Sequence, residues 1–402
     1  MIKRPLYTDF LKQYKDMPLV KILTGIRRCG KSVILQLYAD ELRAMGVPEK
    51  NILFLKFTSY YENEISNDKE LYNKVCAFLE NSEKETGCYI FLDEIQEVNN
   101  WEKAVNALME DKHCDIYVTG SNSKLLSSEI STYLSGRYVQ IPVFPLSFEE
   151  FKNFRKKDSL SEKELLNKYI RLGGFPVIAA GDFDESGAYQ IAEGIFSSVI
   201  TRDIAIRNSI TNMDLFNRTV YFILENTGKT FSANSVVKFL KNEKRSLSVE
   251  TIYNFITWLE QAFIIYRCKR YDIQGKEVLK TQEKYYLADP ALKYSRLGFD
   301  PKGISSMLEN IVYFELRRRG YDVYIGKNKD MEIDFIGINK DTRIYIQVCR
   351  NIPEHSNRET DNLLKINDQF PKYIITLDEY ATGIYEGIKI VHMVDFLSEN
   401  KI

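Results

Sequence analysis

The chain contains little of what metal clusters, disulfide scaffolds and membrane spans require. Its six cysteines are scattered without a Cys-x-x-Cys pair, and it has only three histidines, which argues against a zinc site or a disulfide framework. No apolar run approaches the ~18 residues that cross a bilayer. Charged residues interrupt the first segment, MIKRPLYTDFLKQYKDMP, too early for a signal peptide. We therefore expect a cytoplasmic protein with no membrane partner.

The charge balance is also uninformative about partners. The net charge is −1, so any binding of nucleic acid must come from a local basic patch. A length of 402 residues exceeds what one hydrophobic core supports, which is ~250–300 residues, and several domains are expected.

The first region, residues 1–145, has the pattern of an α/β domain. Short apolar runs alternate with amphipathic stretches, which predicts a parallel sheet covered by helices on both faces. The predicted strands are LVKILT, NILFLKF, CYIFLD, CDIYVTG and YVQIPVF, and the predicted helices include Ser32–Ala44 and Trp101–Lys112.

The rest of the chain divides into three predicted regions. Residues 146–225 indicate a helical, lid-like region with a turn at Gly173–Gly174. Residues 226–300 indicate a winged helix: helices Ser232–Lys241 and Ser248–Ala262, then strands FIIYRCKRYD and KYYLAD joined by a turn at Gly275. Residues 301–402 indicate a second α/β domain, with a helix, the strands YDVYIGK, EIDFIGIN and RIYIQVCR, a helix near Asn357–Phe370 and the strand KYIITLD.

A phosphate-binding loop follows the first predicted strand. GIRRCGKS matches G-x-x-x-x-G-K-[ST] between a strand and a helix, where glycines let backbone N–H groups curl around phosphate oxygens. The lysine would meet the β- and γ-phosphates, and the serine hydroxyl would bind Mg²⁺. Either arginine of the loop could reach phosphate or face a partner. The predicted ATP-binding residues are Gly25, Ile26, Arg27, Arg28, Cys29, Gly30, Lys31, Ser32 and Val33.

Two acids end a later buried strand. YIFLDEI places Asp93 and Glu94 after four apolar-type residues, the arrangement of a magnesium ligand beside a general base. We expect Asp93 to hold Mg²⁺ through water and Glu94 to orient and deprotonate the attacking water.

Two further residues are candidates for catalysis. The strand YVTGSNS ends in Ser121 and Asn122, either of which could contact the γ-phosphate or the lytic water, although a simple turn explains them equally well. Arg137 in SGRYV could act in trans on the nucleotide of a neighbouring subunit in a homo-oligomer. The alternative for Arg137 is an ordinary ion pair.

The order of these motifs resembles a family of prokaryotic AAA-type ATPases. GIRRCGKS, YIFLDEIQEV, VTGSNS, LSGRY, PLSFEEF, GGFP, TRDI and YYLAD carry the resemblance, which covers essentially the whole chain. It implies an AAA-like core, a winged helix and a C-terminal domain related to the PD-(D/E)XK nuclease fold. It supports the nucleotide roles of Gly25, Gly30, Lys31, Ser32, Asp93 and Glu94, and it implies no cellular substrate.

The predicted winged helix carries basic residues that suit duplex DNA. Thr251 and Asn254 could face base edges while nearby lysines meet phosphates. The alternative is a helical module used for packing or oligomer contacts, and Glu250 and Glu260 on the same helix oppose DNA binding. The basic residues are Lys238, Lys241, Lys244, Arg245, Lys269, Arg270, Lys276 and Lys280.

The C-terminal region resembles a nuclease that has lost its chemistry. The pattern places Glu309 in a helix, Asp334 in the second strand, and Gln347 and Cys349 in the third. A nuclease of this fold needs acidic ligands for metal ions and a lysine that activates water. Gln347 stands at the position of the glutamate and Cys349 at that of the lysine, so we expect a binding module. Asp334 could instead pair with Arg343 or Arg350.

Three functions remain open from the sequence. The first is an ATPase whose conformational change acts on DNA or on a protein partner. The second is a nucleotide-gated signalling protein with slow hydrolysis. The third is a nuclease gated by ATP.

Overall fold

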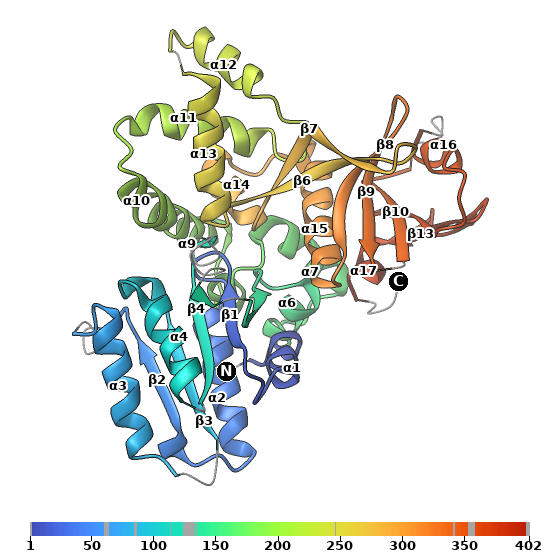
Figure 1. Ribbon diagram of the computed structural model, residues 1–402. Coiled ribbons are helices and arrows are strands. Elements are labelled where there is room, and N and C mark those ends of the chain that lie inside the picture. The colour runs from blue at the N-terminus through green and yellow to red at the C-terminus, as the bar shows by residue number, and fades with distance from the viewer. Residues whose placement is uncertain are drawn as a thin grey trace. The chain divides into compact units, whose positions relative to one another are not determined.

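The computed structural model describes residues 2–59, 64–83, 87–112, 114–123, 133–134, 136–245, 247–340, 342–352 and 358–398 (Figure 1). The chain divides into two compact units. Unit 1 comprises Met1–Phe144 and Gln261–Phe263, and unit 2 comprises Pro145–Glu260 and Ile264–Ile402. Within the described ranges, no helix is long and apolar enough to cross a membrane.

Unit 1 contains a five-stranded sheet with the order β2-β3-β4-β1-β5, and every neighbouring pair is parallel. The predicted strands are all present to within a few residues. The strands are β1 Val20–Thr24, β2 Ile52–Lys56, β3 Cys88–Asp93, β4 Cys114–Gly120 and β5 Tyr138–Pro142; the helices are α1 Pro5–Gln13, α2 Lys31–Ala44, α3 Asp68–Glu80 and α4 Trp101–Asp111.

Both faces of this sheet are buried, because alternate side chains of each strand point to opposite sides. On one face Ile90 and Ile116 pack in a core with α3 and α4, to which Val105 contributes. On the other face Phe91 and Tyr117 stack on each other, and both rings contact Tyr38 of α2. This two-sided burial explains why β3 reads as a continuous apolar run.

Unit 2 begins with helices and ends with a mixed α/β region, as predicted. The helices are α6 Phe148–Phe154, α7 Glu162–Leu172, α8 Pro176–Ala180, α9 Glu185–Ser198, α10 Ile206–Asn208, α11 Met213–Glu225, α12 Ala233–Asn242, α13 Val249–Gln261, α14 Pro290–Leu297, α15 Ile304–Arg318, α16 Arg358–Leu364 and α17 Met393–Ser398, with a π-helix over Val199–Ala205. The strands are β6 Ile265–Asp272, β7 Glu277–Leu287, β8 Asp322–Asn328, β9 Met331–Asn339, β10 Thr342–Cys349, β11 Lys372–Thr376, β12 Gly383–Tyr385 and β13 Ile388–His392.

The strands of unit 2 form one sheet, not two. Its order is β12-β13-β11-β10-β9-β8-β6-β7, so the β6–β7 hairpin continues the sheet of the C-terminal region. The join is a parallel pairing of β6 with β8, in which Arg270 lies opposite Ile325. The predicted boundary between regions 226–300 and 301–402 therefore does not separate two compact bodies. The periodicity of apolar residues predicts where a strand lies in the sequence. It does not predict which other strand will pair with the free edge of that strand.

Two of the motifs that carry the family resemblance meet in this unit. Gly173 ends α7 with φ 74°, and the carboxylate of Asp289 lies where a Cβ at Gly173 would stand. Asp289 accepts hydrogen bonds from the backbone N–H groups of Gly174 (2.6 Å) and Ala291 (2.8 Å), and the second caps α14. GGFP and YYLAD are thus two halves of one buried contact, which requires a glycine at position 173.

Candidate functional site

The loop between β1 and α2 has the backbone of a phosphate cradle. Gly25 has φ 157°, and a Cβ there would lie 2.1 Å from the carbonyl oxygen of Val143. Gly30 precedes α2 with φ 106°, a conformation that L-residues with side chains avoid. The N-terminus of α2 begins at Lys31 and adds the positive end of its dipole. Each glycine of the motif is therefore required by the geometry.

Lys31 is buried at the centre of this loop. Its ammonium donates to the carbonyl oxygens of Gly25 (2.9 Å) and Ile26 (3.2 Å) and lies 3.8 Å from Glu94 Oε1. A phosphate oxygen would be a stronger, charged acceptor than these carbonyl groups. Lys31 can therefore bind a phosphate by giving up its hydrogen bonds to the carbonyl groups of the loop.

Asp93 lies at the end of β3 and faces the start of α2. Its Oδ1 accepts hydrogen bonds from Ser32 Oγ (2.9 Å) and Thr119 Oγ1 (2.6 Å). Its Oδ2 is buried and has no hydrogen-bond partner among the described residues. Burial raises the pKa of Asp93 and the charge of Glu94 raises it further, against the lowering effect of these hydrogen bonds.

Mg²⁺ prefers oxygen ligands and keeps several of its own waters. The unpartnered Asp93 Oδ2 beside the Ser32 hydroxyl fits a hydrated magnesium ion that is bound together with a nucleotide. Within the described part of the chain, no group of three or more His, Cys, Asp or Glu residues could hold a metal ion by protein ligands alone.

Glu94 is held in a left-handed backbone conformation, with φ 57° and ψ 49°. Its N–H donates to Thr119 Oγ1 (2.9 Å), and its carboxylate accepts a hydrogen bond from Gln96. Burial alone would raise the pKa of Glu94, but the charges of Lys31 and Arg27 and the bond from Gln96 lower it overall. The side chain therefore stays ionised and can accept a proton.

The other loop residues divide by exposure. Ile26 and Cys29 are buried, Arg27 is half-buried, and Arg28 and Val33 are exposed. Ile26 and Cys29 therefore support the loop from within, and Arg28 faces solvent with φ 70°.

Asn122 and Arg137 lie at opposite ends of the parallel strands of unit 1. Asn122 follows the carboxyl end of β4, and Arg137 precedes the amino end of β5. Asn122 is buried two residues after Gly120, which pairs with Thr24 directly before the loop. Arg137 precedes β5, at the amino end of the parallel strands, and its guanidinium donates to Asn106 (2.7 Å) and Glu110 (3.0 Å) of α4. Arg137 therefore does not reach the loop of its own chain.

Three residues around the site were assigned no role from the sequence. Thr119 links Asp93 to Glu94, and Gln96 bonds the Glu94 carboxylate. Arg4 is buried and donates to the carbonyl oxygens of Cys29 (2.8 Å) and Phe144 (3.0 Å), so it holds the phosphate loop from behind. The only available signal was the run of polar residues after YV in β4.

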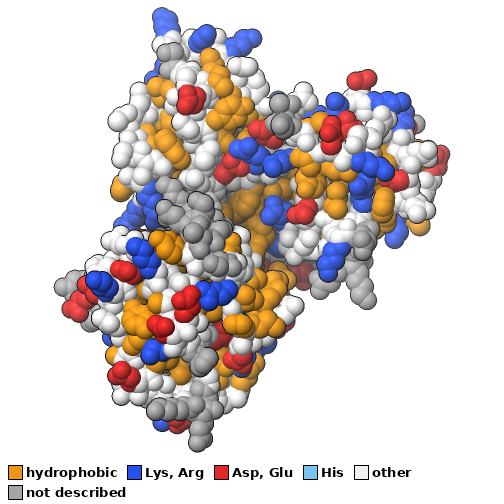
Figure 2. Space-filling model, in the orientation of Figure 1, with side chains coloured by type: hydrophobic (Ala, Val, Ile, Leu, Met, Phe, Trp, Pro, Cys, Tyr) orange, Lys and Arg blue, Asp and Glu red, His pale blue; other side chains and the backbone are white. Residues whose placement is uncertain are grey.

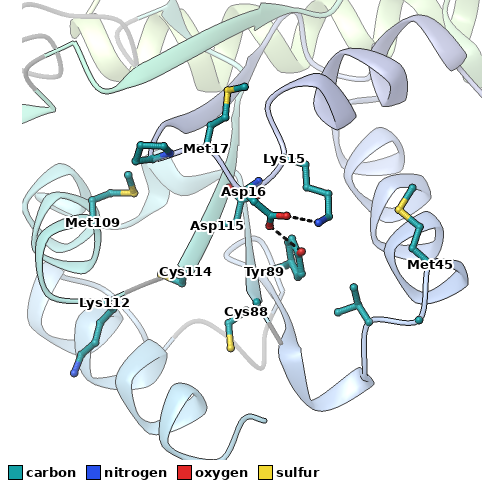
Figure 3. A pocket seen from close by; sticks show the side chains of 14 residues that line it. Lys15, Asp16, Met17, Met45, Cys88, Tyr89, Met109, Lys112, Cys114 and Asp115 are labelled. Carbon is teal, nitrogen blue, oxygen red and sulfur yellow. Dashed lines mark hydrogen bonds and ion pairs between the residues drawn. The ribbon is translucent and has the colours of Figure 1, made fainter. Parts of the chain in front are cut away.

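A cavity of about 560 Å³ lies at the amino ends of the strands of the same sheet (Figure 3). It is bordered by Cys88 and Cys114, which begin β3 and β4, and by Met45 after α2. Tyr89 donates to the carboxylate of Asp16 (2.9 Å), which also pairs with Lys15. Ligands of open parallel sheets bind beyond the carboxyl ends of the strands. This cavity at the amino ends is therefore separate from the nucleotide site.

The predicted DNA-binding face of unit 2 is only partly basic. Lys238, Lys241 and Lys244 are exposed on and after α12, where Figure 2 shows several Lys and Arg side chains. Arg245 instead pairs with Asp214, and Arg270 is buried against Glu332. These two arginines, which belong to the predicted basic cluster, are neutralised within the chain.

Most of the remaining residues of this face are exposed. Ser248 caps α13 by accepting the N–H of Thr251 (3.0 Å), and Asn254 is exposed. Lys269 and Lys276 are exposed on the β6–β7 hairpin, and the side chain of Lys280 lies outside the described part. Val249, the first residue of α13, is 39% exposed.

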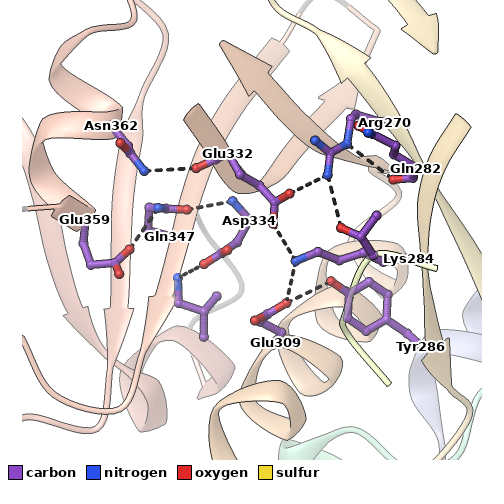
Figure 4. Close-up of polar contacts among 12 residues, drawn as sticks. Arg270, Gln282, Lys284, Tyr286, Glu309, Glu332, Asp334, Gln347, Glu359 and Asn362 are labelled. Carbon is purple, nitrogen blue, oxygen red and sulfur yellow. Dashed lines mark hydrogen bonds and ion pairs between the residues drawn. The ribbon is translucent and has the colours of Figure 1, made fainter. Parts of the chain in front are cut away.

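The predicted acidic residues of the C-terminal region lie close together. Glu309 of α15, Asp334 of β9 and Gln347 of β10 meet beside the hairpin strand β7 (Figure 4). Asp334 does not pair with Arg343, whose guanidinium donates to the hydroxyls of Tyr271 and Tyr345. Burial raises the pKa of the Cys349 thiol to about 11, so this side chain is neutral near pH 7.

Comparison with known proteins agrees with this geometry. The profile of the family described as "AAA domain" matches residues 18–152, and that of a "Domain of unknown function (DUF8612)" matches residues 163–303. The chain is 39% identical to a protein of Haemophilus influenzae over 99% of this chain and 98% of that protein. It is 32% identical to protein MJ1544 of Methanocaldococcus jannaschii over 85% of this chain and 77% of that protein.

Among solved structures, the Walker-type ATPase PABY2304 of Pyrococcus abyssi is similar in fold. The TM-score is 0.52 at 15% sequence identity, over 73% of this chain and 95% of that chain. The parallel sheet, the phosphate loop and the full-length relatives agree, and the chain belongs to a family of AAA-type P-loop ATPases together with these Haemophilus and Methanocaldococcus proteins.

Proposed function

We propose that the protein binds ATP with Mg²⁺ in unit 1 and hydrolyses it, and that hydrolysis drives a conformational change acting on DNA or on a protein partner. One observation carries the proposal: the buried, unpartnered Oδ2 of Asp93 lies beside Ser32, with Lys31 and Glu94 next to it. A buried carboxylate oxygen without a partner is costly unless a ligand completes it.

Each residue of the site has a distinct role in this proposal. The backbone of Gly25–Val33 surrounds the phosphates, and Lys31 neutralises the β- and γ-phosphates. Ser32 and Asp93 hold Mg²⁺, directly and through water. Glu94 accepts the proton of the attacking water, and its lowered pKa keeps it ready to do so. Asn122 contacts the γ-phosphate or the lytic water, since it follows the strand next to β1.

We assign Arg137 a role between subunits. Its position at the amino end of β5 supports action on a neighbour's nucleotide, because its own loop follows the carboxyl ends of the strands. The ion pair with Glu110 is exposed on both sides and would break at little cost when a second subunit docks.

For the partner, exposed lysines at the end of α12 support contact with duplex DNA in the manner of a winged helix. Lys238, Lys241 and Lys244 would meet phosphates while Asn254 of α13 faces the bases. Glu250 is exposed on the same helix and would weaken the contact.

The decisive experiment measures phosphate release and assembly state together, with and without duplex DNA. Turnover stimulated by DNA supports the proposal. Slow turnover that ignores DNA, together with nucleotide-dependent assembly, supports a signalling protein. A wild type that neither binds nor hydrolyses ATP would remove the proposal altogether.

The DNA surface has a matched control. Reversing the charges of Lys238, Lys241 and Lys244 to glutamate should abolish DNA binding and reduce its dependence on salt. The same reversal at Lys156 and Lys157, exposed after α6 in the same unit, should leave binding nearly unchanged. Equal losses in both variants would mean that binding is unspecific attraction to positive charge.

A further inference from the structure

A partly buried charged cluster joins the β6–β7 hairpin to the C-terminal region of unit 2 (Figure 4). Lys284 of β7 is 4% exposed, and its ammonium lies 2.9 Å from Glu332 Oε1 and 3.3 Å from Glu309 Oε2. Arg270 of β6 pairs with the other oxygen of Glu332. Glu309 also accepts a hydrogen bond from the hydroxyl of Tyr286 (3.1 Å).

The acids of this cluster are satisfied from within the chain. Asp334 Oδ2 accepts the N–H of Val348 (2.8 Å), and the N–H of Asp334 donates to Gln347 Oε1 (2.7 Å). The amide of Gln347 in turn donates to Glu359 (2.9 Å). Gln347 is thus occupied at both ends of its amide and is not placed as a metal ligand.

The acids of the cluster have two cationic partners within the chain, Lys284 and Arg270. Burial raises the pKa of Asp334 well above its usual range, and the charge of Glu309 raises it further; the pKa of Glu309 is raised mainly by burial. Burial alone would lower the pKa of Lys284, but Glu309, Asp334 and Glu332 raise it overall, so the ammonium stays charged.

The resemblance to PD-(D/E)XK nucleases implies divalent metal ions at this place, and the residues do not fit them. With Lys284 in place, the described residues contain no group of three acids, cysteines or histidines that could hold a metal ion. A divalent ion would have to displace a buried ammonium and bind beside it. Cys349 is a neutral thiol near pH 7, so it does not replace the lysine that activates water in such nucleases.

We propose that Lys284 is the permanent counter-ion of this acidic cluster and occupies the place that a divalent metal ion would need. The lysine comes from the hairpin and its acids from α15 and β9, so the same contact fastens the hairpin to the C-terminal region. The cluster then acts as an internal brace of unit 2 and performs no metal-dependent cleavage. This inference does not depend on ATP hydrolysis in unit 1.

The test counts bound Mn²⁺ by electron paramagnetic resonance on the full chain. Each titration is paired with the same protein carrying Asp334→Asn, so that Mn²⁺ at the nucleotide site cancels from the difference. Wild type and Asp334→Asn should bind the same number of ions. Lys284→Met frees the acids and should bind one ion more than Lys284→Met/Asp334→Asn, and Mn²⁺ should raise its melting temperature.

The control is Lys293→Met, which removes a comparably buried lysine of α14 outside the cluster and should gain no ion. A wild type that binds one ion more than Asp334→Asn would overturn the proposal, and this comparison decides the matter even if Lys284→Met does not fold. A folded Lys284→Met that gains no ion would also contradict it. So would cutting of linear or circular DNA, with Mg²⁺ or Mn²⁺ and ATP, that disappears in Asp334→Ala.

Discussion

Each unit of this protein buries a lysine beside a pair of acids, but the two clusters are completed differently. In unit 1, Lys31 bonds to backbone carbonyl groups and stays 3.8 Å from Glu94, while Asp93 keeps an unpartnered oxygen. In unit 2, Lys284 contacts Glu309 and Glu332 directly. The first cluster is left open for a ligand, and the second is closed by the chain itself.

The difference shows that residue types alone do not distinguish a binding site from a structural ion cluster. Breaking a buried, fully paired cluster by removing one partner typically costs ~3–5 kcal/mol. An incomplete cluster gains its missing interactions from a ligand instead. Four substitutions test the roles assigned to charged side chains in the two units.

The largest effect is expected for Lys31→Ala, which should abolish ATP binding and turnover because the phosphates lose a buried cation. Wild type at ~100 times the dissociation constant of ATP should gain about 2.7 kcal/mol of stability, seen as a shift in melting temperature. Lys284→Met is the matched control and should keep the whole shift from its own lower starting temperature. An undiminished shift in Lys31→Ala would place the nucleotide elsewhere.

Glu94→Gln should bind ATP normally and lower turnover by about 10²- to 10⁴-fold, since the amide keeps the shape of the side chain and loses the base. Binding is measured by titration and turnover by phosphate release. Gln96→Ala, which removes only the hydrogen bond to Glu94, should have a smaller effect on turnover. If Glu94→Gln turned over at the wild-type rate, another group would have to be the base.

Arg137→Ala should lower turnover by about tenfold or more while ATP affinity is kept, because its charge acts on the neighbour's nucleotide. Mixing this variant with Lys31→Ala subunits should restore part of the activity, since each supplies what the other lacks. Glu110→Ala removes the partner of Arg137 in its own chain and should not reduce turnover. Full activity of a monomeric wild type would exclude the role in trans.

Asp289→Asn should leave turnover unchanged, which is the smallest effect of the four. It tests a buried carboxylate that accepts hydrogen bonds from the backbone N–H groups of Gly174 and Ala291. Burial raises the pKa of Asp289 from 3.8 to about 7. The folded state then binds the proton more tightly than the unfolded state, so the contribution of Asp289 to stability falls as pH rises from about 4 to 7. The excess unfolding free energy of wild type over Asp289→Asn should fall over that range, by roughly 4 kcal/mol at most. A constant difference would show that Asp289 is ionised throughout.

The arrangement of the candidate nucleotide site could be predicted in part because its residues are adjacent in the chain. Gly25–Ser32 and Asp93–Glu94 each form one short segment whose spacing is required by the ligand. Thr119 and Arg4 escaped notice, because they reach the site from distant segments through hydrogen bonds that no local pattern signals. Nothing in the local sequence around Arg4 distinguishes it from a surface residue.

Unit 2 was predicted less completely for the same reason. Its helices and most of its strands follow from periodicity, and the resemblance to a nuclease places Gln347 and Cys349 at the positions of its glutamate and lysine. The role of Lys284 depends on which strand pairs with β8, and that choice is made by long-range packing. The β6–β7 hairpin of the predicted winged helix is consequently part of a larger sheet.

The continuity of that sheet limits how this protein can be shortened or recombined. A chain ending at Gly303, where the second matching family profile stops, would keep β6 but lose β8, its parallel partner. It would also leave Lys284 and Arg270 without Glu309 and Glu332. Such a fragment exposes the unpaired edge of β6 next to two cations that have lost their acidic partners, so it is expected to self-associate. Removing the C-terminal region therefore also removes the strand and ion-pair partners of the hairpin.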